Sequence, residues 1–212
     1  MSEIIGTSSQ VIDEYVRSAE QIFNRVRERM QLMVTRAFTL TYEGPDAELH
    51  FNPGLIKMAT SSVGQMDEAM AGFANALSQV TANISRSLGG EGITLAYTPR
   101  PLELPPPPGV AADDYRIDVA AFDGFIAGEL PDLRGAIGAL IDENQQAFAA
   151  IPRATASQRG WSGQSREHAQ NVIVPNQSDQ LRQILLLVTD QITDFMTQAR
   201  NAVVGADQAG VG

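Results

Sequence analysis

Hydrophobic residues recur at three- and four-residue steps in several stretches of the chain, and the first stretch runs from about Ser9 to Phe38. This spacing predicts a long amphipathic helix, because it places the apolar side chains on one helical face. Thr7, Ser8 and Ser9 are candidate residues for capping its N-terminus. The apolar positions are Ile12, Tyr15, Ala19, Ile22, Val26, Met30, Met33 and Ala37, with Phe23 and Val34 widening the stripe.

The most regular pattern follows Pro53, which breaks helix and predicts the start of a second helix with Asn52 as its cap. Its apolar residues alternate strictly at three and four positions, which is typical of left-handed knobs-into-holes packing. We expect the glycines of 89–92 to end this helix. The apolar positions are Ile56, Ala59, Val63, Met66, Met70, Phe73, Leu77, Val80 and Ile84.

The second half of the chain repeats this order of elements. Asp113 and Asp114 are capping signals before a stripe that runs through Ile117, Ala121, Phe125, Leu130, Leu133, Ile137, Leu140, Ala147, Phe148 and Ile151. Within it, Gly124, Gly128, Gly135 and Gly138 either allow a close helix approach or, with Pro131, divide the stretch into two helices. Beyond Pro175 a last helix is predicted, which ends at Gly205 and carries Leu181, Leu185, Val188, Ile192, Phe195, Ala199 and Ala202.

Charged residues outside the apolar stripes are expected to face solvent. Glu20 and Glu28 alternate with the arginines of the first helix, which favours a solvated face over a binding patch. The adjacent pairs Asp67-Glu68 and Asp142-Glu143 also fall outside the stripes. The arginines concerned are Arg17, Arg25, Arg27, Arg29 and Arg36.

Two glycine-containing segments are predicted to form the corners between consecutive helices. One corner contains Trp161 and Gly163, where glycines allow the chain to reverse and the indole can cover the end of the apolar stripe. Tyr42 and Gly44 repeat the aromatic-x-Gly spacing in the first half. The two halves therefore read as a duplicated helical hairpin.

A proline-rich linker joins the halves and contains the run 105–108. It could be a ligand for an aromatic groove, but spacer duty is favoured, because about twenty residues of polyproline geometry reach roughly 60 Å. A helix of thirty residues is only about 45 Å long. We predict hairpins at 1–90 and 113–205, a linker at 91–112 and a flexible tail at 206–212.

Four amphipathic helices in one chain favour an all-α fold, a four-helix bundle in which two antiparallel hairpins bury every stripe. The composition agrees, since 43% of the 212 residues are hydrophobic. A net charge of −10 without a basic stripe argues against nucleic-acid partners. With no signal segment and no apolar run long enough to span a bilayer, we expect any export to occur without a cleavable signal peptide.

Catalytic chemistry is missing from the sequence. The absence of Cys excludes disulfides, thiolate metal sites and Cys nucleophiles. His50 and His168 are isolated, with no carboxylate at ligand spacing, so no metal site is expected. There is no glycine-rich phosphate loop or nucleophile elbow either. We therefore predict no enzyme, no catalytic residues and no cofactor.

The Trp161-Ser162-Gly163 segment between two long helices, with no signal peptide or Cys, resembles the Trp-x-Gly family of helical-hairpin proteins exported by type VII (ESX) secretion. Tyr42-Glu43-Gly44 looks like a degenerate copy. Members of that family are typically exported as dimers of two hairpins, so the resemblance implies a covalently fused pair, an intramolecular pseudo-dimer. Fourteen of the 15 basic residues are Arg, a bias that suggests a GC-rich genome. The resemblance implies an actinobacterial host.

The resemblance implies a secreted factor or secretion partner, cytoplasmic before export, whose partners are the secretion machinery or a co-secreted protein. The family's Tyr-x-x-x-Asp/Glu signal usually follows the last helix, whereas here Tyr42 and Asp46 have that spacing within the corner. A carrier partner or a divergent signal would explain this departure. The alternatives are a cytosolic helical adaptor or chaperone for an effector and, less favoured, an enzyme with an unrecognised site.

Overall fold

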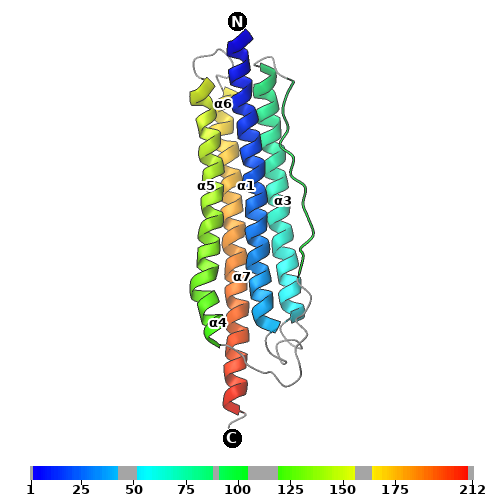
Figure 1. Cartoon of the computed structure of the whole chain (residues 1–212), viewed down its shortest axis with the longest axis vertical. Helices are drawn as coiled ribbons and strands as arrows, with labels where there is room; N and C mark the ends of the chain where they lie inside the picture. The colour runs from blue at the N-terminus through cyan, green and yellow to red at the C-terminus, as the bar shows by residue number, and fades with distance from the viewer. Residues whose placement is uncertain (1, 43–51, 88–90, 105–118, 156–163, 210–212) are drawn as a thin grey trace. The chain divides into compact units, whose positions relative to one another are not determined.

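The protein is an all-α four-helix bundle in the computed structural model (Figure 1), which describes residues 2–42, 52–87, 91–104, 119–155 and 164–209. Every regular element among these residues is helical, and 91–104 has no regular secondary structure. The long apolar stripes explain this, because each can be buried only against other helices. The elements are α1 (Ser2–Tyr42), α3 (Asn52–Ser87), α4 (Val119–Gly124), η1 (Phe125–Glu129), α5 (Leu130–Thr155), α6 (Gln164–His168), η2 (Ala169–Ile173) and α7 (Val174–Ala209).

The chain divides into two compact units, and each combines residues from both halves of the sequence. Unit 1 comprises Met1–Arg27, Met66–Arg100 and Gly138–Gln183. Unit 2 comprises Glu28–Gln65, Pro101–Ile137 and Ile184–Gly212. Each unit thus has its own segments of α1, α3, α5 and α7.

The core of unit 1 is built on aromatic contacts between α1 and its neighbours. The rings of Phe23 and Phe73 lie 5.5 Å apart between α1 and α3. Tyr15 meets Phe148 edge-on at the same distance between α1 and α5. The predicted stripe positions of α1 are all buried, which confirms the periodicity of the first helix.

Unit 2 buries the remaining parts of the same stripes. Met30 and Met33 of α1, Phe125 of η1 and Ile192 of α7 are fully buried there. On its surface, Arg36 forms a bidentate ion pair with Glu129, with both N–O distances 2.9 Å. Described core positions of the predicted α3 stripe are buried, except for the half-buried Val80.

Helix ends differ from the prediction. α1 begins at Ser2, so Thr7, Ser8 and Ser9 lie inside the helix and do not cap it. α7 continues to Ala209, past Gly205, where we expected it to end. One helical glycine costs only about 1 kcal/mol relative to alanine, which is too little to stop a long helix.

The stripe of α7 also drifts from strict heptad spacing. Met196 is fully buried, whereas Phe195 is half-buried and Ala202 is exposed. A straight α-helix has 3.6 residues per turn, so a 3.5-residue repeat turns away from the core by about 20° per heptad. The buried position therefore moves by one residue along the helix.

Two π-helical turns explain how the second half accommodates Pro131 and Pro175. The Leu130 N–H donates to the Phe125 carbonyl just before Pro131, and the Val174 N–H donates to the Ala169 carbonyl just before Pro175. A proline has no N–H and its ring clashes with the carbonyl four residues earlier, and a wider turn relieves this conflict. Pro131 and Pro175 thus follow π turns and do not separate the helices, whereas Pro152 lies within α5.

The glycines near Pro131 do not serve as close-approach positions. A Cβ atom added at Gly124, Gly128, Gly135 or Gly138 would meet nothing within 4 Å. No described helix therefore packs directly against these positions, and that alternative of the prediction is wrong. No described helix is both long and apolar enough to cross a membrane.

Candidate functional site

The predicted motif residues fall largely outside the described part of the chain. Trp161, Gly163, Gly44 and His50 all lie outside it. Tyr42 is the last residue of α1, and its side chain also lies outside the description. Both corners therefore remain predictions.

The most elaborate polar site in unit 1 is centred on an ion pair between α1 and α3. Arg27 Nε lies 2.9 Å from Asp67 Oδ2, and the two side chains are only 5% and 2% exposed. The prediction that both residues face solvent is therefore wrong. Arg27 follows Phe23 by four residues and precedes Val34 by seven, so it belongs to the widened apolar stripe.

An extended segment, residues 91–100, covers this ion pair, and we call it the strap. The Tyr97 hydroxyl donates to Asp67 Oδ1 at 2.6 Å. The Arg100 backbone N–H donates to Asp67 Oδ2 at 3.3 Å, and Arg27 donates to the Arg100 carbonyl at 3.1 Å. Asp67 thus accepts hydrogen bonds from α1 and from two residues of the strap.

Side chains of α3 hold the strap by its backbone. Ser78 Oγ accepts a hydrogen bond from the Leu95 N–H at 2.7 Å and donates to the Leu95 carbonyl at 2.9 Å. Ser85 accepts a hydrogen bond from the Gly92 N–H at 3.3 Å. The Thr81 hydroxyl lies 3.2 Å from the Ile93 carbonyl, although the Leu77 carbonyl of its own helix is a closer acceptor at 2.9 Å. As the strap advances, its partners move back along α3, so the two segments run antiparallel.

The strap makes polar contacts with α1 as well. The Ala96 N–H donates to Glu20 at 3.0 Å, and the Arg100 guanidinium donates to Asn24 at 3.2 Å. In unit 2, Gln31 continues this pattern by exchanging hydrogen bonds with both backbone groups of Glu103. The partner residues advance together along both segments, so α1 and the extended segment run parallel.

Two side chains anchor the strap in the core of unit 1. Leu95 is 4% exposed, whereas Thr94 and Ala96 on either side are exposed. The ring of Tyr97 lies 5.8 Å from that of Phe23 in an edge-on arrangement. Side chains two residues apart lie on the same side of an extended chain, so Leu95 and Tyr97 face the helices together.

The electrostatics of the site keep Tyr97 in its donor form. Burial raises the pKa of the Tyr97 hydroxyl far above its usual range, and the hydrogen bond to the Asp67 carboxylate raises this pKa further. A phenolate beside this carboxylate would place two negative charges in contact. The neutral hydroxyl instead completes the hydrogen bonding of a buried ion pair.

A second buried polar pair joins the two halves of the sequence. The Tyr15 hydroxyl donates to Asn144 Oδ1 at 3.3 Å, and burial raises the pKa of this hydroxyl. Asn144 Nδ2 and the Ser178 hydroxyl, also buried, have no hydrogen-bond partner within the described residues. A buried amide NH₂ without acceptors costs free energy, and such polar groups are retained in some proteins because they fix which helices pair.

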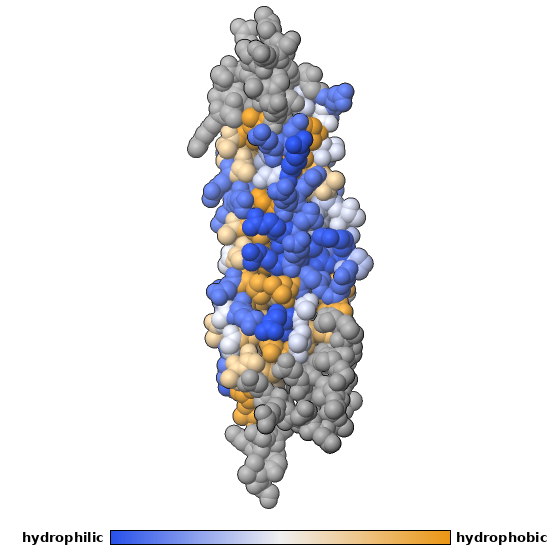
Figure 2. All heavy atoms as spheres, viewed as in Figure 1, coloured by the Kyte–Doolittle hydropathy of each residue, from blue (hydrophilic) through white to orange (hydrophobic). Residues whose placement is uncertain are grey.

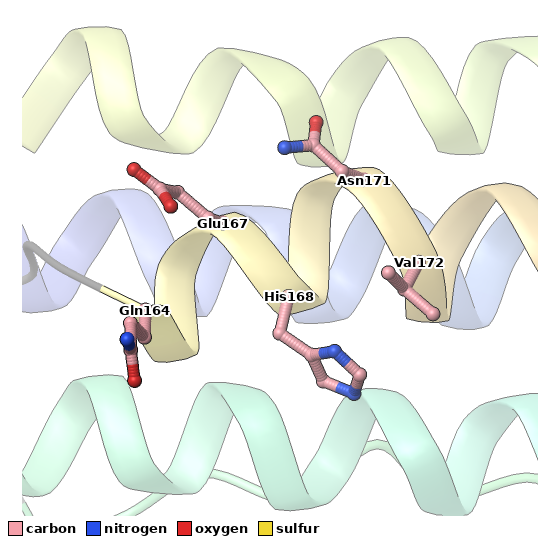
Figure 3. A pocket seen from close by; sticks show the side chains of 5 residues that line it. All are labelled: Gln164, Glu167, His168, Asn171 and Val172. Carbon is pink, nitrogen blue, oxygen red and sulfur yellow. The ribbon is translucent and has the colours of Figure 1, made fainter.

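An open surface hollow of about 610 Å³ lies along α6 and η2 and includes His168. In Figure 3, Glu167 and Asn171 point to one side of the helix, whereas Gln164 and His168 point to the other. These side chains do not converge as an acid–base pair would. Among the described residues, no group of three or more His, Asp or Glu side chains could hold a metal ion.

Comparisons with known proteins identify no relative. No protein-family model matches the chain, and no curated protein or solved structure is significantly similar to it. The similarity to Trp-x-Gly proteins therefore rests on the sequence features alone.

Sequence reasoning missed the strap contacts and the two buried polar pairs. Arg27, Asp67 and Asn144 are residue types that usually face solvent, so hydrophobicity patterns assign them there. One signal was present for the strap, because Leu95 and Tyr97 are apolar residues with the two-residue spacing of an extended chain. The glycines before this pair and the prolines after it gave the segment the composition of a linker.

Proposed function

We propose that this chain is a non-enzymatic, type VII secretion-associated protein, a single-chain equivalent of a Trp-x-Gly hairpin dimer. It acts as a secreted factor or as a secretion partner. Its partners are proteins, namely the secretion machinery or a co-secreted protein. Its place of action is outside the cell, after a cytoplasmic stage.

The observation that carries the proposal is the packing of the first half of the chain against the second. Tyr15 of α1 contacts both Phe148 and Asn144 of α5 in unit 1. One chain therefore supplies the helix pairs that two separate hairpins would contribute to a dimer. The Trp161-x-Gly163 segment between long helices adds the sequence resemblance.

The polar groups of the described sites are consistent with a non-enzymatic role. Arg27, Asp67 and Tyr97 use their polar atoms to hold the strap. The hollow beside His168 is open and its polar side chains diverge. These features favour a role based on surfaces over one based on a reaction.

Export is the direct test. The tagged chain would be expressed in an actinobacterium with a type VII system, in the parent strain and in a strain lacking the secretion ATPase. We expect the chain in the culture filtrate of the parent only, with recovery on complementation and a cytosolic enzyme as the lysis control. Equal amounts in both filtrates, or full retention in the cytosol, would contradict the proposal.

Substitutions of Trp161 test whether export depends on the Trp-x-Gly motif. Trp161→Ala is expected to reduce export, and Trp161→Phe, which keeps an aromatic ring, to retain more of it. Thermal melts of both purified variants would separate loss of recognition from loss of folding. Equal export of Trp161→Ala and the parent chain would remove the motif from the proposal.

A cytosolic adaptor or chaperone is the second candidate. The observation that favours it is a pair of adjacent exposed leucines on α7, Leu186 and Leu187, which are 48% and 49% exposed. By contrast, most of the face shown in Figure 2 is hydrophilic, with smaller hydrophobic areas between the hydrophilic side chains. Retention in the cytosol with a stoichiometric partner, lost in Leu186→Asp/Leu187→Asp, would select this function.

A further inference from the structure

We infer that the surface of α1 and α3 beneath the strap is a binding site for an extended peptide, and that the strap is its intramolecular occupant. The strap site consists of side chains in unit 1, Glu20, Arg27, Asp67, Ser78 and Ser85. The partner that fits it is an extended segment of another protein with a large aliphatic residue and, two positions later, a tyrosine. This inference goes beyond the proposed function and does not depend on export.

Most of the polar contacts address the strap's backbone and not its side chains. Ser78 satisfies both the N–H and the carbonyl of Leu95. Glu20 accepts the next N–H, and Ser85 accepts the N–H of Gly92. Any extended segment in this register presents the same groups, so these contacts favour extended peptides without reading their sequence.

Two side chains supply the specificity. Leu95 is buried, and Tyr97 reaches both the ring of Phe23 and the carboxylate of Asp67. The residues beside them, Thr94, Ala96 and Thr98, are exposed and leave a partner's sequence free at those positions. The recognised pattern is therefore Leu-x-Tyr, with the tyrosine hydroxyl required as a donor.

An empty strap site would be unfavourable because it contains a buried ion pair. Without the strap, Asp67 would lose the hydrogen bonds from Tyr97 and from the Arg100 N–H. Apolar surface of Phe23 would also lose its contact with Tyr97. Leaving buried charges and polar groups unsatisfied is costly, so a second peptide would be favoured wherever the strap leaves.

The strap itself sets how strongly a free peptide can bind. A segment tethered to its site acts at a high effective concentration, on the order of millimolar for short flexible connections. A peptide in trans can bind only the fraction of molecules whose site is open, so its apparent affinity falls by that fraction. Weakening the strap should therefore reveal the site.

The experiment uses full-length chains and a fluorescent synthetic peptide with the sequence of residues 91–104. Fluorescence anisotropy would compare its binding to the wild-type chain and to Leu95→Ala/Tyr97→Ala. We expect at least tenfold tighter binding to the double variant. A peptide carrying the same two alanines should bind neither chain, and adding Ser78→Ala to the double variant should weaken binding of the parent peptide.

Circular dichroism establishes that each variant is folded. If the double variant loses its helical signal, Leu95→Ala alone replaces it, with the same expected order of affinities. Unchanged anisotropy with a folded variant, or equal binding of parent and alanine peptides, would overturn the inference. A complex between the double variant and the wild-type chain would make a second copy the occupant and overturn the assignment to a different protein.

Discussion

Arg27 on α1 and Asp67 on α3 form an ion pair 2.9 Å long that is almost completely enclosed beneath the strap. Burying such a pair is expensive, because both charges leave water, and the cost is offset only when the remaining hydrogen bonds are made. Tyr97 and the backbone of Arg100 make them here. The strap is therefore part of the folded structure of unit 1.

Removing one partner of this ion pair should strongly destabilise the chain. Asp67→Ala leaves the Arg27 charge buried without its carboxylate, which costs about 3–5 kcal/mol. The free energy of unfolding would be measured by chemical denaturation. Glu68→Ala is the matched control, since Glu68 is the exposed neighbour, and it should change stability by less than about 0.5 kcal/mol. Equal effects of the two substitutions would contradict a buried ion pair.

The Tyr15–Asn144 pair predicts a non-additive double-mutant cycle. Among the described residues, the Tyr15 hydroxyl is the only hydrogen-bond partner of the Asn144 side chain, so Tyr15→Phe should cost about 1–3 kcal/mol. Adding Asn144→Leu removes the stranded amide and should recover much of that loss, because replacing both partners by apolar groups can be nearly neutral. Thermal or denaturant unfolding of the four chains completes the cycle. Strictly additive losses would count against the pair.

Alkaline pH should weaken the fold through Tyr15, which is buried, and Tyr97, which is half-buried. Burial raises the pKa of Tyr15, and burial together with Asp67 raises that of Tyr97. The folded chain keeps these protons where the unfolded chain loses them, so stability is complete below about pH 10 and falls as pH rises further. The slope reaches up to about 1.4 kcal/mol per pH unit for each group.

Near-ultraviolet absorbance of tyrosinate provides the measurement. Of the four tyrosines, Tyr15 and Tyr97 should ionise only as the helical circular dichroism signal disappears. Tyr15→Phe should reduce the alkaline slope of the unfolding free energy by one group. Reversible ionisation of all four tyrosines near pH 10 in the folded chain would refute this assignment.

The helices and their apolar faces were predictable because periodicity reports burial directly. Tyr15, Phe23 and Met30 are buried as their spacing predicts. Helix ends were less predictable, since Gly205 alone cannot stop a helix. The π turns before Pro131 and Pro175 depend on how the neighbouring turns relax, which no local propensity encodes.

The Arg27–Asp67–Tyr97 site could not be predicted from the sequence because its residues are far apart along the chain. A carboxylate such as Asp67 is placed in the core only by a partner forty residues earlier and a tyrosine thirty residues later. Each residue alone is typical of a solvated surface. Only their arrangement in space satisfies the buried charge, and a linear pattern does not contain that arrangement.

Secretion is the measurement that bears most directly on the proposed function. The quantity is the fraction of tagged chain in the culture filtrate of an actinobacterium, compared between the parent and a strain that lacks only the type VII secretion ATPase. We predict a filtrate fraction well above the cytosolic marker in the parent, its fall to the marker's level in the deletion strain, and recovery on complementation. A filtrate fraction that is the same in both strains would contradict the account.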